Sequence, residues 1–532
     1  MNSTYDIAIV GSGFGGSLLA MIAQRLGRSV LLLEKGKHPR FAIGESSTPL
    51  SNILFEQLTT RYDLPALAPL AKWGNWQRAY PQVACGLKRG FTFYHHTLGA
   101  PSSADTERRG QLLVAASPHD AIADTHWYRE EFDHLLVQQA QKLGVEYRDE
   151  VTLRNVVESD TTISLEGERR GEAFCIHARF LVDATGPRGF LHHALGLGEI
   201  PLPDFPATQA LFSHFTGIGR LDDGSPQERL SPDASQFPPY PVDDAAVHHV
   251  FDGGWIWVLK FNNGITSAGV AATDTTAQTL RFSEGEAAWQ RLVDSIPELR
   301  KQFVNAKPTR GFTYMPRLAF RSKSVLGKRW ALLPSAAGFV DPLLSTGFPL
   351  TLLGVTRLAE LLEDHWDKPD FSIYLKAYAE KTDAELLAAA RLIGCLYRTM
   401  DRFPMFVSIS MLYFAAASFA ESARRLQKRH LAPSFLLHDD ARFGPAMREC
   451  LALAAQSKTE TEMHDAAKQI AATIGPINIA GLCTAARNNW YAVDARDLLE
   501  NAHKLESTRE ELNQLLQSCG FWEARSTAAK QV

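Results

Sequence analysis

The amino-acid sequence predicts an α/β fold: a nucleotide-binding module with an embedded β-sheet region, followed by a helical C-terminal region. Three observations predict it. A strand, a glycine-rich turn, a helix and a second strand open the chain; strand-like apolar segments recur between residues 207 and 318; and the apolar spacing is helical after residue 367. We therefore predict a module over residues 1–366, with sheet segments at approximately 60–110 and 200–320, and a helical region over 367–532.

The opening segment, YDIAIVGSGFGGSLLAMIAQRLGRSVLLLEKG, carries the strongest motif. We predict a strand over residues 6–10, a helix over 17–26 and a second strand over 29–33. Between the first strand and the helix, Gly11, Gly13 and Gly16 form GxGxxG, in which the glycines permit a tight turn, close approach to a pyrophosphate and close packing of helix on strand. Glu34 ends the second strand, where an acid binds ribose hydroxyls. This combination predicts a Rossmann-like dinucleotide site for either NAD or FAD.

Segments further along the chain favour FAD. Arg129 begins an amphipathic helix, an apolar strand ends at Asp183 and is followed by Gly186, and RWALLPSAAGFVDPLLSTG comes later. This is the segment order of the large two-domain FAD-binding oxidoreductases. No second GxGxxG follows a strand, so we expect a separate flavin reductase to supply the electrons as FADH2.

Four motifs make the chain resemble the flavin-dependent halogenases over most of its length. They are HPRFAIGESSTPLSNILFEQL with Arg40 and Ser46, CGLKRGFTFYHH with Lys88, GGWIWVLKF with Trp255 and Trp257, and FVDPLLSTG, which matches FxxPxxSxG from Phe339 to Gly347. The late segments GPINIAGLCTAARNNWY and SMLYFAAASFAE are similar to the phenol and pyrrole branch of that family.

This resemblance implies a mechanism. Reduced FAD and oxygen together oxidise chloride or bromide to hypohalous acid, and Lys88 is the catalytic residue that receives it. Trp255 and Trp257 keep the substrate away from the flavin. The resemblance also places the turn formed by Ser345, Thr346 and Gly347 beside the flavin. Backbone N–H groups at a helix start attract anions, so we expect this turn to hold the halide; the alternative is a plain junction that carries only the flavin edge.

Two departures from the family pattern affect the expectations. Pro334-Ser335 stands where a flavin-binding Gly-Asp is usual, which removes one ribityl contact, and Asp341 is the nearby candidate for a flavin contact. Leu344 stands where tryptophan halogenases carry a glutamate. Without that carboxylate, a ring already activated by its own hydroxyl or pyrrole nitrogen is favoured.

The alternation of residues around Lys88 supports an interpretation that does not depend on the family resemblance. Residues 88–93 alternate as in one strand, and a lysine that points inward from such a strand loses basicity through burial. The amine can then either form a chloramine or donate a hydrogen bond that orients hypohalous acid. Pattern alone equally allows a solvated lysine on an edge strand; the surrounding motifs favour the buried one. Lys72 has no such motif around it.

Composition and residue spacing argue against several classes of protein, namely nucleic-acid-binding, disulfide-bonded, metal-binding and membrane-spanning proteins. The formal charge is −4 with no basic tract, so we expect no nucleic-acid partner. Six cysteines are scattered singly, which fits reduced thiols in a cytoplasmic protein, and neither they nor the paired histidines have metal-ligand spacing. Residues 403–420 are uncharged but contain a proline and three serines, so we predict a buried helix and no membrane span. We expect residues 219–246 to form either an excursion over the active site or a disordered loop. We expect the last ten residues to be a frayed end.

The predicted function is therefore chlorination or bromination of an electron-rich aromatic substrate of phenol or pyrrole type, either free or tethered to a carrier protein. One alternative is an FAD-dependent aromatic hydroxylase, which would leave Lys88 and the FxxPxxSxG turn unexplained. A second is a flavin-binding protein without turnover, which only Pro334-Ser335 supports.

Overall fold

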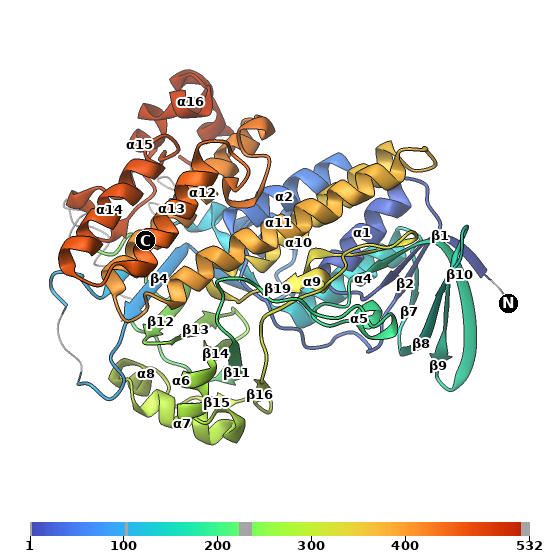
Figure 1. Ribbon diagram of the computed structural model, residues 1–532, viewed down its shortest axis with the longest axis horizontal. Helices are drawn as coiled ribbons and strands as arrows, with labels where there is room; N and C mark the ends of the chain where they lie inside the picture. Colours follow the sequence, from blue (N-terminus) through green and yellow to red (C-terminus); the bar gives the residue numbers. More distant parts are fainter. Residues whose placement is uncertain (1–2, 102–104, 223–236, 523–532) are drawn as a thin grey trace, which may run out of the picture.

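The computed structural model describes residues 3–101, 105–222 and 237–522, and its first layer is a seven-stranded sheet in the order β7-β2-β1-β10-β9-β8, with β18 also paired to β10 (Figure 1). The strands from β7 to β10, and β18, pair in parallel, whereas β9 and β8 add an antiparallel edge. The bounds are β1 Ser3–Val10, β2 Val30–Leu33, β7 Glu146–Arg148, β8 Val151–Glu158, β9 Ile163–Arg169, β10 Glu172–Asp183 and β18 Trp330–Leu332.

Helix α1 (Phe14–Arg25) connects β1 to β2, which confirms the Rossmann-like unit. It begins three residues before the predicted start because Phe14, Gly15 and Gly16 are already helical and buried. Helix α4 (Arg129–Lys142) packs beside α1 and begins at the predicted residue.

The second layer is a nine-stranded sheet in the order β15-β11-β14-β13-β12-β4-β5-β20, with β16 paired to β11. Its bounds are β4 Gly90–His95, β5 Gln111–Ala115, β11 Thr208–Thr216, β12 Ala246–Phe251, β13 Gly254–Lys260, β14 Thr266–Thr273, β15 Lys307–Pro308, β16 Thr313–Met315 and β20 Trp490–Tyr491. Helices α6 (Asp274–Thr279), α7 (Glu286–Asp294) and α8 (Pro297–Gln302) bury an apolar cluster against it. Strand β20 comes from the C-terminal region, which is therefore not purely helical.

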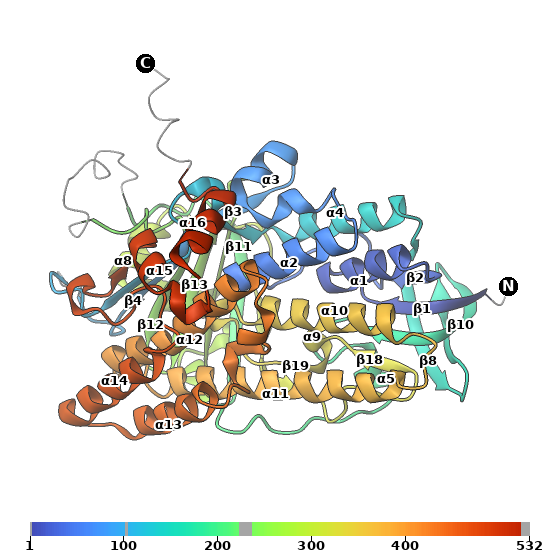
Figure 2. The ribbon, with the colours of Figure 1, turned by 90° about the horizontal axis from the view of Figure 1, so that it is seen from above.

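Most of the remaining described residues are helical, apart from two two-stranded sheets, one of which pairs β17 (Phe320–Arg321) with β19 (Gly338–Phe339). In Figure 2, α10 and α11 run side by side along the long axis, and the later helices gather at the end opposite the N-terminus. The bounds are α2 Pro49–Arg61, α3 Trp73–Ala79, α5 Phe190–Ala194, α9 Pro334–Ala337, α10 Gly347–Asp364, α11 Phe371–Tyr397, α12 Phe403–Arg425, α13 Phe443–Gln456, α14 Glu460–Ile474, α15 Ala495–Glu500 and α16 Arg509–Ser518.

The uncharged segment at residues 403–420 forms most of α12. By length and composition alone this helix is apolar enough to cross a membrane, but 78% of its most apolar window is buried inside the protein. Phe406 and Phe414 of α12 pack edge-on against aromatic rings of β4. It therefore packs as a core helix, as predicted.

The single strand predicted around Lys88 is wrong. Cys85–Lys88 form β3, which pairs with β6 (Asp124–Trp127), and β4 begins in the other sheet at Gly90. The break falls at Arg89, whose N–H donates to the Asp244 carbonyl and whose carbonyl accepts from the Ala116 N–H, each at 2.7 Å. Lys88 therefore ends a short strand, directly opposite Asp124.

Two expectations concern residues that the structure mostly leaves undescribed. Within the predicted excursion at 219–246, residues 223–236 lie outside the described chain, and so do the last ten residues. All six cysteines are free thiols.

Candidate active site

A cavity of about 1320 Å³ lies between the two sheets. Pockets for drug-sized ligands measure about 300–1,000 Å³, so this one has room for a dinucleotide. Fourteen of the predicted site residues line it: Gly11, Gly13, Gly16, Glu34, Arg40, Ser46, Arg129, Gly186, Trp255, Trp257, Asp341, Ser345, Thr346 and Gly347. The other three, Lys88, Asp183 and Leu344, lie behind its wall.

The glycine turn at one end of the cavity fits a pyrophosphate. Gly11 has φ +100°, and a Cβ on it would lie 2.6 Å from the Ala184 carbonyl oxygen. A Cβ on Gly16 would lie 2.0 Å from the Gly11 carbonyl oxygen. Side chains are thus excluded where the backbone turns into α1, which leaves the N–H groups at the helix start open to a phosphate.

Glu34 is placed to accept hydrogen bonds from a ribose. Its carboxylate accepts from the Ser12 hydroxyl at 2.7 Å and from Arg40 Nη2 at 2.8 Å. Burial by itself would raise the pKa of Glu34, but Arg40 and the backbone N–H of Gly36 outweigh it and lower the pKa to about 2. Glu34 is therefore ionised at neutral pH.

Arg129 holds the segment at residues 40–46 against the cavity. Its guanidinium pairs with Asp133 through two hydrogen bonds of 2.8 and 2.6 Å and donates to the Gly44 carbonyl at 2.9 Å. It also lies over the ring of Phe14, 5.0 Å from the centroid. Since the same side chain lines the cavity, it joins the glycine turn to the segment that carries Ser46.

Asp183 shapes the cavity without lining it. Its carboxylate accepts from the backbone N–H groups of Thr185 at 2.9 Å and Leu191 at 2.7 Å, and this holds the turn at Gly186. Pro334 and Ser335, the unusual pair, do line the cavity. The Pro334 ring occupies the space beside Gly354 of α10, where a Cβ would approach to 2.3 Å.

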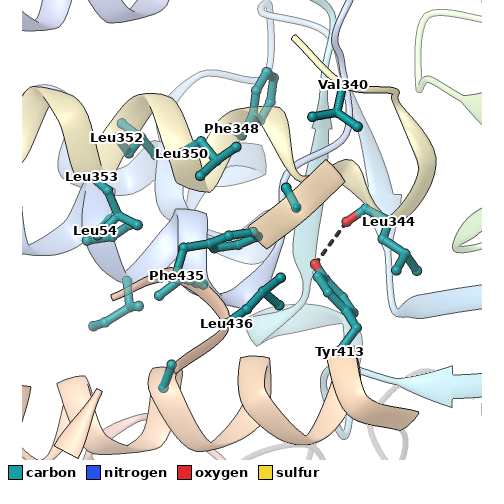
Figure 3. Packing of buried hydrophobic residues seen from close by; sticks show 14 of the residues in the cluster. Leu54, Val340, Leu344, Phe348, Leu350, Leu352, Leu353, Tyr413, Phe435 and Leu436 are labelled. Atoms are coloured by element: carbon teal, nitrogen blue, oxygen red, sulfur yellow. Dashed lines mark hydrogen bonds between the residues drawn. The ribbon is translucent and has the colours of Figure 1, made fainter. Parts of the chain in front are cut away.

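The turn before α10 has two consecutive residues in the left-handed region, Leu344 at φ +60° and Ser345 at φ +54°. Each such residue costs about 1–3 kcal/mol. The Tyr413 hydroxyl of α12 donates to the Leu344 carbonyl at 2.8 Å and holds the turn in place (Figure 3). At the start of α10 there is no side-chain cap, and the N–H groups of Thr346 and Gly347 donate to no described residue. The turn thus presents open donors to the cavity.

Asp341 links this turn to the tryptophan pair. Its carboxylate accepts from Trp255 Nε1 at 3.1 Å, from the Tyr397 hydroxyl at 2.8 Å and from the Leu343 N–H at 2.9 Å. Burial raises the pKa of Asp341 to about 7, although these donors oppose the shift. Trp255 and Trp257 lie 5.7 Å apart on the cavity wall, and Trp257 fits because a Cβ on Gly269 would lie 2.3 Å from its ring.

Replacing Asp341 with Asn tests this raised pKa. A carboxyl whose pKa rises from about 4 to about 7 on folding stabilises the fold fully below pH 4, and that contribution is lost as the pH rises to 7. We therefore expect the melting temperature of Asp341→Asn, relative to that of the wild type, to increase between pH 4 and 7. Above pH 7 the difference between the two melting temperatures should stay constant. Thermal melts across this range measure the difference, and a constant difference would contradict the assignment.

Lys88 is fully buried, so the alternative that it is a solvated lysine on an edge strand is wrong. Its amine donates to the Ser46 hydroxyl at 2.8 Å and to the Ser47 carbonyl at 2.6 Å, and it lies 3.9 Å from the centroid of the Phe91 ring. Ser46 therefore separates Lys88 from the cavity by one side chain. The sequence assigned Ser46 to the cofactor alone; the structure also joins it to the lysine.

The sequence analysis assigned no role in the site to four further residues around Lys88, which are Asn52, Asp124, His248 and Tyr413. His248 lines the cavity, stacks 4.4 Å from the ring of Phe93, and has its pKa lowered to about 3 by burial. Its neighbour His249 points away and bonds His96 at 2.9 Å. No metal-binding group of three or more His, Cys, Asp or Glu occurs within the described ranges.

A Rossmann-like turn and an ionised ribose acceptor that face one large cavity define a dinucleotide-binding protein. The family model described as tryptophan halogenase matches residues 124–405, and that of the FAD binding domain matches residues 6–199. The first match spans more than half of the chain, which therefore belongs to the tryptophan halogenase family.

The relatives agree. Tetracycline 7-halogenase of Kitasatospora aureofaciens is 28% identical over 78% of this chain and 73% of its own length. Monodechloroaminopyrrolnitrin halogenase PrnC of Pseudomonas fluorescens is 27% identical over 77% of this chain and 70% of its own. In fold, halogenase PltM in complex with phloroglucinol and FAD matches with a TM-score of 0.80 at 24% identity, over 92% of this chain and 99% of its own.

These comparisons identify the chain as a flavin-dependent halogenase. Its cofactor is FAD and its co-substrate is a halide. They favour the halogenase over the hydroxylase and over a flavin-binding protein without turnover.

Proposed function

We propose that this enzyme chlorinates or brominates a phenol- or pyrrole-type ring, with hypohalous acid relayed to Lys88. The observation that carries the proposal is the hydrogen bonding of the buried amine. A neutral amine has two N–H donors and one lone pair, and Lys88 uses two donors, toward Ser46 and Ser47. The lone pair then stays available to a halogen. Burial lowers the pKa of Lys88 and favours this neutral form.

In this proposal the bound cofactor, as FADH2 with O2, supplies the oxidising equivalent that turns halide into hypohalous acid. Gly11, Gly13, Gly16, Glu34, Arg40 and Arg129 hold its nucleotide end, with Asp183 and Gly186 shaping the wall beside it. The open N–H groups of Thr346 and Gly347, next to Ser345, hold the halide as partial charges, which bind an anion without making it a poor nucleophile. Asp341 holds Trp255 against this turn.

The substrate side is closed by the predominantly helical region that begins at residue 367 and is described to residue 522. Tyr413 of α12 fixes the Leu344 carbonyl, and Phe414 packs 5.3 Å from the Phe91 ring beside Lys88. Leu344 leaves the turn without a carboxylate side chain, which supports a substrate that is activated by its own hydroxyl or ring nitrogen. Trp255 and Trp257 screen that substrate from the flavin. The electron donor is a separate flavin reductase, and the substrate is free or tethered to a carrier protein.

The test is a product analysis with a separate flavin reductase, FAD, oxygen and either chloride or bromide. We expect mass spectrometry to find the halogen isotope pattern on phenols or pyrroles, offered free and as carrier-protein thioesters, and not on tryptophan, which serves as the matched control. Halogenated tryptophan with unmodified phenols and pyrroles would contradict the proposed substrate class. Hydroxylated products without halogen would contradict the proposed chemistry.

A further inference from the structure

The charge environment of Lys88 contains one residue with no role so far, Asp124. It stands directly opposite Lys88 in the antiparallel pair of β3 and β6, and directly opposite residues share one face of a sheet. Lys88 is fully buried and Asp124 is 7% exposed. A carboxylate and an amine are therefore enclosed together in an otherwise aromatic part of the core.

The geometry differs from that of a structural ion pair. The Lys88 amine donates to Ser46 and Ser47 rather than to Asp124. Asp124 Oδ1 accepts from Asn52 Nδ2 at 2.6 Å, whereas Oδ2 has no hydrogen-bond partner among the described residues. A buried carboxylate oxygen left open is costly, and here it belongs to the residue that is paired across the two strands with Lys88, although the amine forms no ion pair with it.

We propose that Asp124 is a positioning residue that takes up the proton of Lys88 when the amine accepts halogen. The inference rests on the proposed role of Lys88. The ammonium first turns from Ser46 toward Asp124 and gives its proton to that carboxylate. The amine then attacks the halogen of hypohalous acid: the N–X bond forms, the O–X bond breaks, and the released hydroxide leaves as water with a proton from nitrogen.

The second half of the cycle restores the amine. The ring carbon takes the halogen from nitrogen, and the ring proton returns to the nitrogen, so that halogenated product and free amine result. The halogen keeps its +1 oxidation state from oxygen to nitrogen to carbon, and no further oxidant is needed. Asp124 then shares its proton with Lys88 again.

The other titratable groups around the pair are not suited to take up the proton of Lys88. His126 of β6 and His248 of β12 both have their pKa lowered by burial and by the Lys88 charge. Of the groups that α12 places toward Asp124, Arg425 and Glu421 pair with each other at 2.8 Å, and the Tyr413 hydroxyl is bound to Leu344. Burial raises the pKa of Asp124, and the Lys88 charge opposes the rise, so the carboxyl can hold a proton near neutral pH.

The test compares Asp124→Asn with the wild type by two measurements on the full chain. The first is the titration of Lys88 by NMR with 13C-labelled lysine, its signal being the one lost in Lys88→Gln. We expect Asp124→Asn to titrate at least about one pH unit lower, because the attracting charge is gone. The second is turnover: at pH values below the lowered Lys88 titration, where the ammonium of Asp124→Asn has no internal acceptor, halogenation should fall about 10- to 100-fold relative to the wild type while flavin oxidation is unchanged, and Asp124→Glu should restore part of it.

Asp243→Asn is the matched control, since Asp243 is also a buried carboxylate, 3% exposed, but bonds the backbone of Leu221 and Asp222. We expect it to leave the Lys88 titration and turnover unchanged. An unaltered Lys88 titration in Asp124→Asn, or halogenation at the wild-type rate by that variant below its Lys88 titration, would overturn the inference. Because the NMR titration needs no turnover, it separates this failure from that of the proposed function, which would appear as halogenation by Lys88→Gln.

Discussion

Lys88→Gln is expected to abolish halogenation while flavin oxidation continues. Gln keeps a donor for the Ser47 carbonyl and nearly the length of the lysine, but it has no basic lone pair to accept halogen. Removal of a nucleophile that acts with its partners as a unit costs several powers of ten, so we expect a loss of at least about 10³-fold in halogenated product. Mass spectrometry of the product and oxygen uptake measure the two activities separately.

The controls for this variant are Lys88→Met and Lys72→Gln. Lys88→Met also lacks the amine and should be equally inactive. Lys72 is partly exposed, and its amine lies 3.7 Å from Glu56, so its loss should leave turnover within about twofold, as for most surface changes. Halogenation that persists in both Lys88 variants would remove this residue from the mechanism.

Gly11→Ala is expected to weaken FAD binding strongly. The new Cβ would lie 2.6 Å from the Ala184 carbonyl oxygen, which belongs to the backbone and cannot rotate away as a side chain could. Gly11 also has a φ of +100°. The φ strain alone costs about 1–2 kcal/mol, and the clash must move the turn that faces the pyrophosphate. Since 1.4 kcal/mol is tenfold in Kd, we expect FAD affinity to fall by at least about 100-fold, measured by flavin fluorescence titration.

Gly27→Ala separates strain from clash. Gly27 also has a positive φ, +77°, but a Cβ there meets nothing within 4 Å. It should lower the melting temperature slightly and leave FAD affinity unchanged. Equal losses of affinity in the two variants would mean that the turn at Gly11 does not hold the cofactor.

The elements nearest the N-terminus were the most predictable. The strand–turn–helix–strand unit occurs where its pattern places it, apart from the earlier start of α1, and the helix from Arg129 begins at the predicted residue. Each is fixed by local apolar spacing, and the turn also requires its glycines. The strand at Lys88 was not predictable, since the alternation continues through Arg89 and only hydrogen bonds to two distant segments break it.

The same division holds for the site. By itself the sequence determined the class of nucleotide site, the buried lysine as a candidate and the absence of a carboxylate side chain at Leu344, because these depend on residue identity at motif positions. Only the tertiary structure decided that Ser46 bonds Lys88, that Tyr413 holds the strained turn and that Asp124 faces the amine. These contacts join residues 36 to 69 positions apart, and a pairing over such distances is set by packing, which leaves no periodic trace in the sequence.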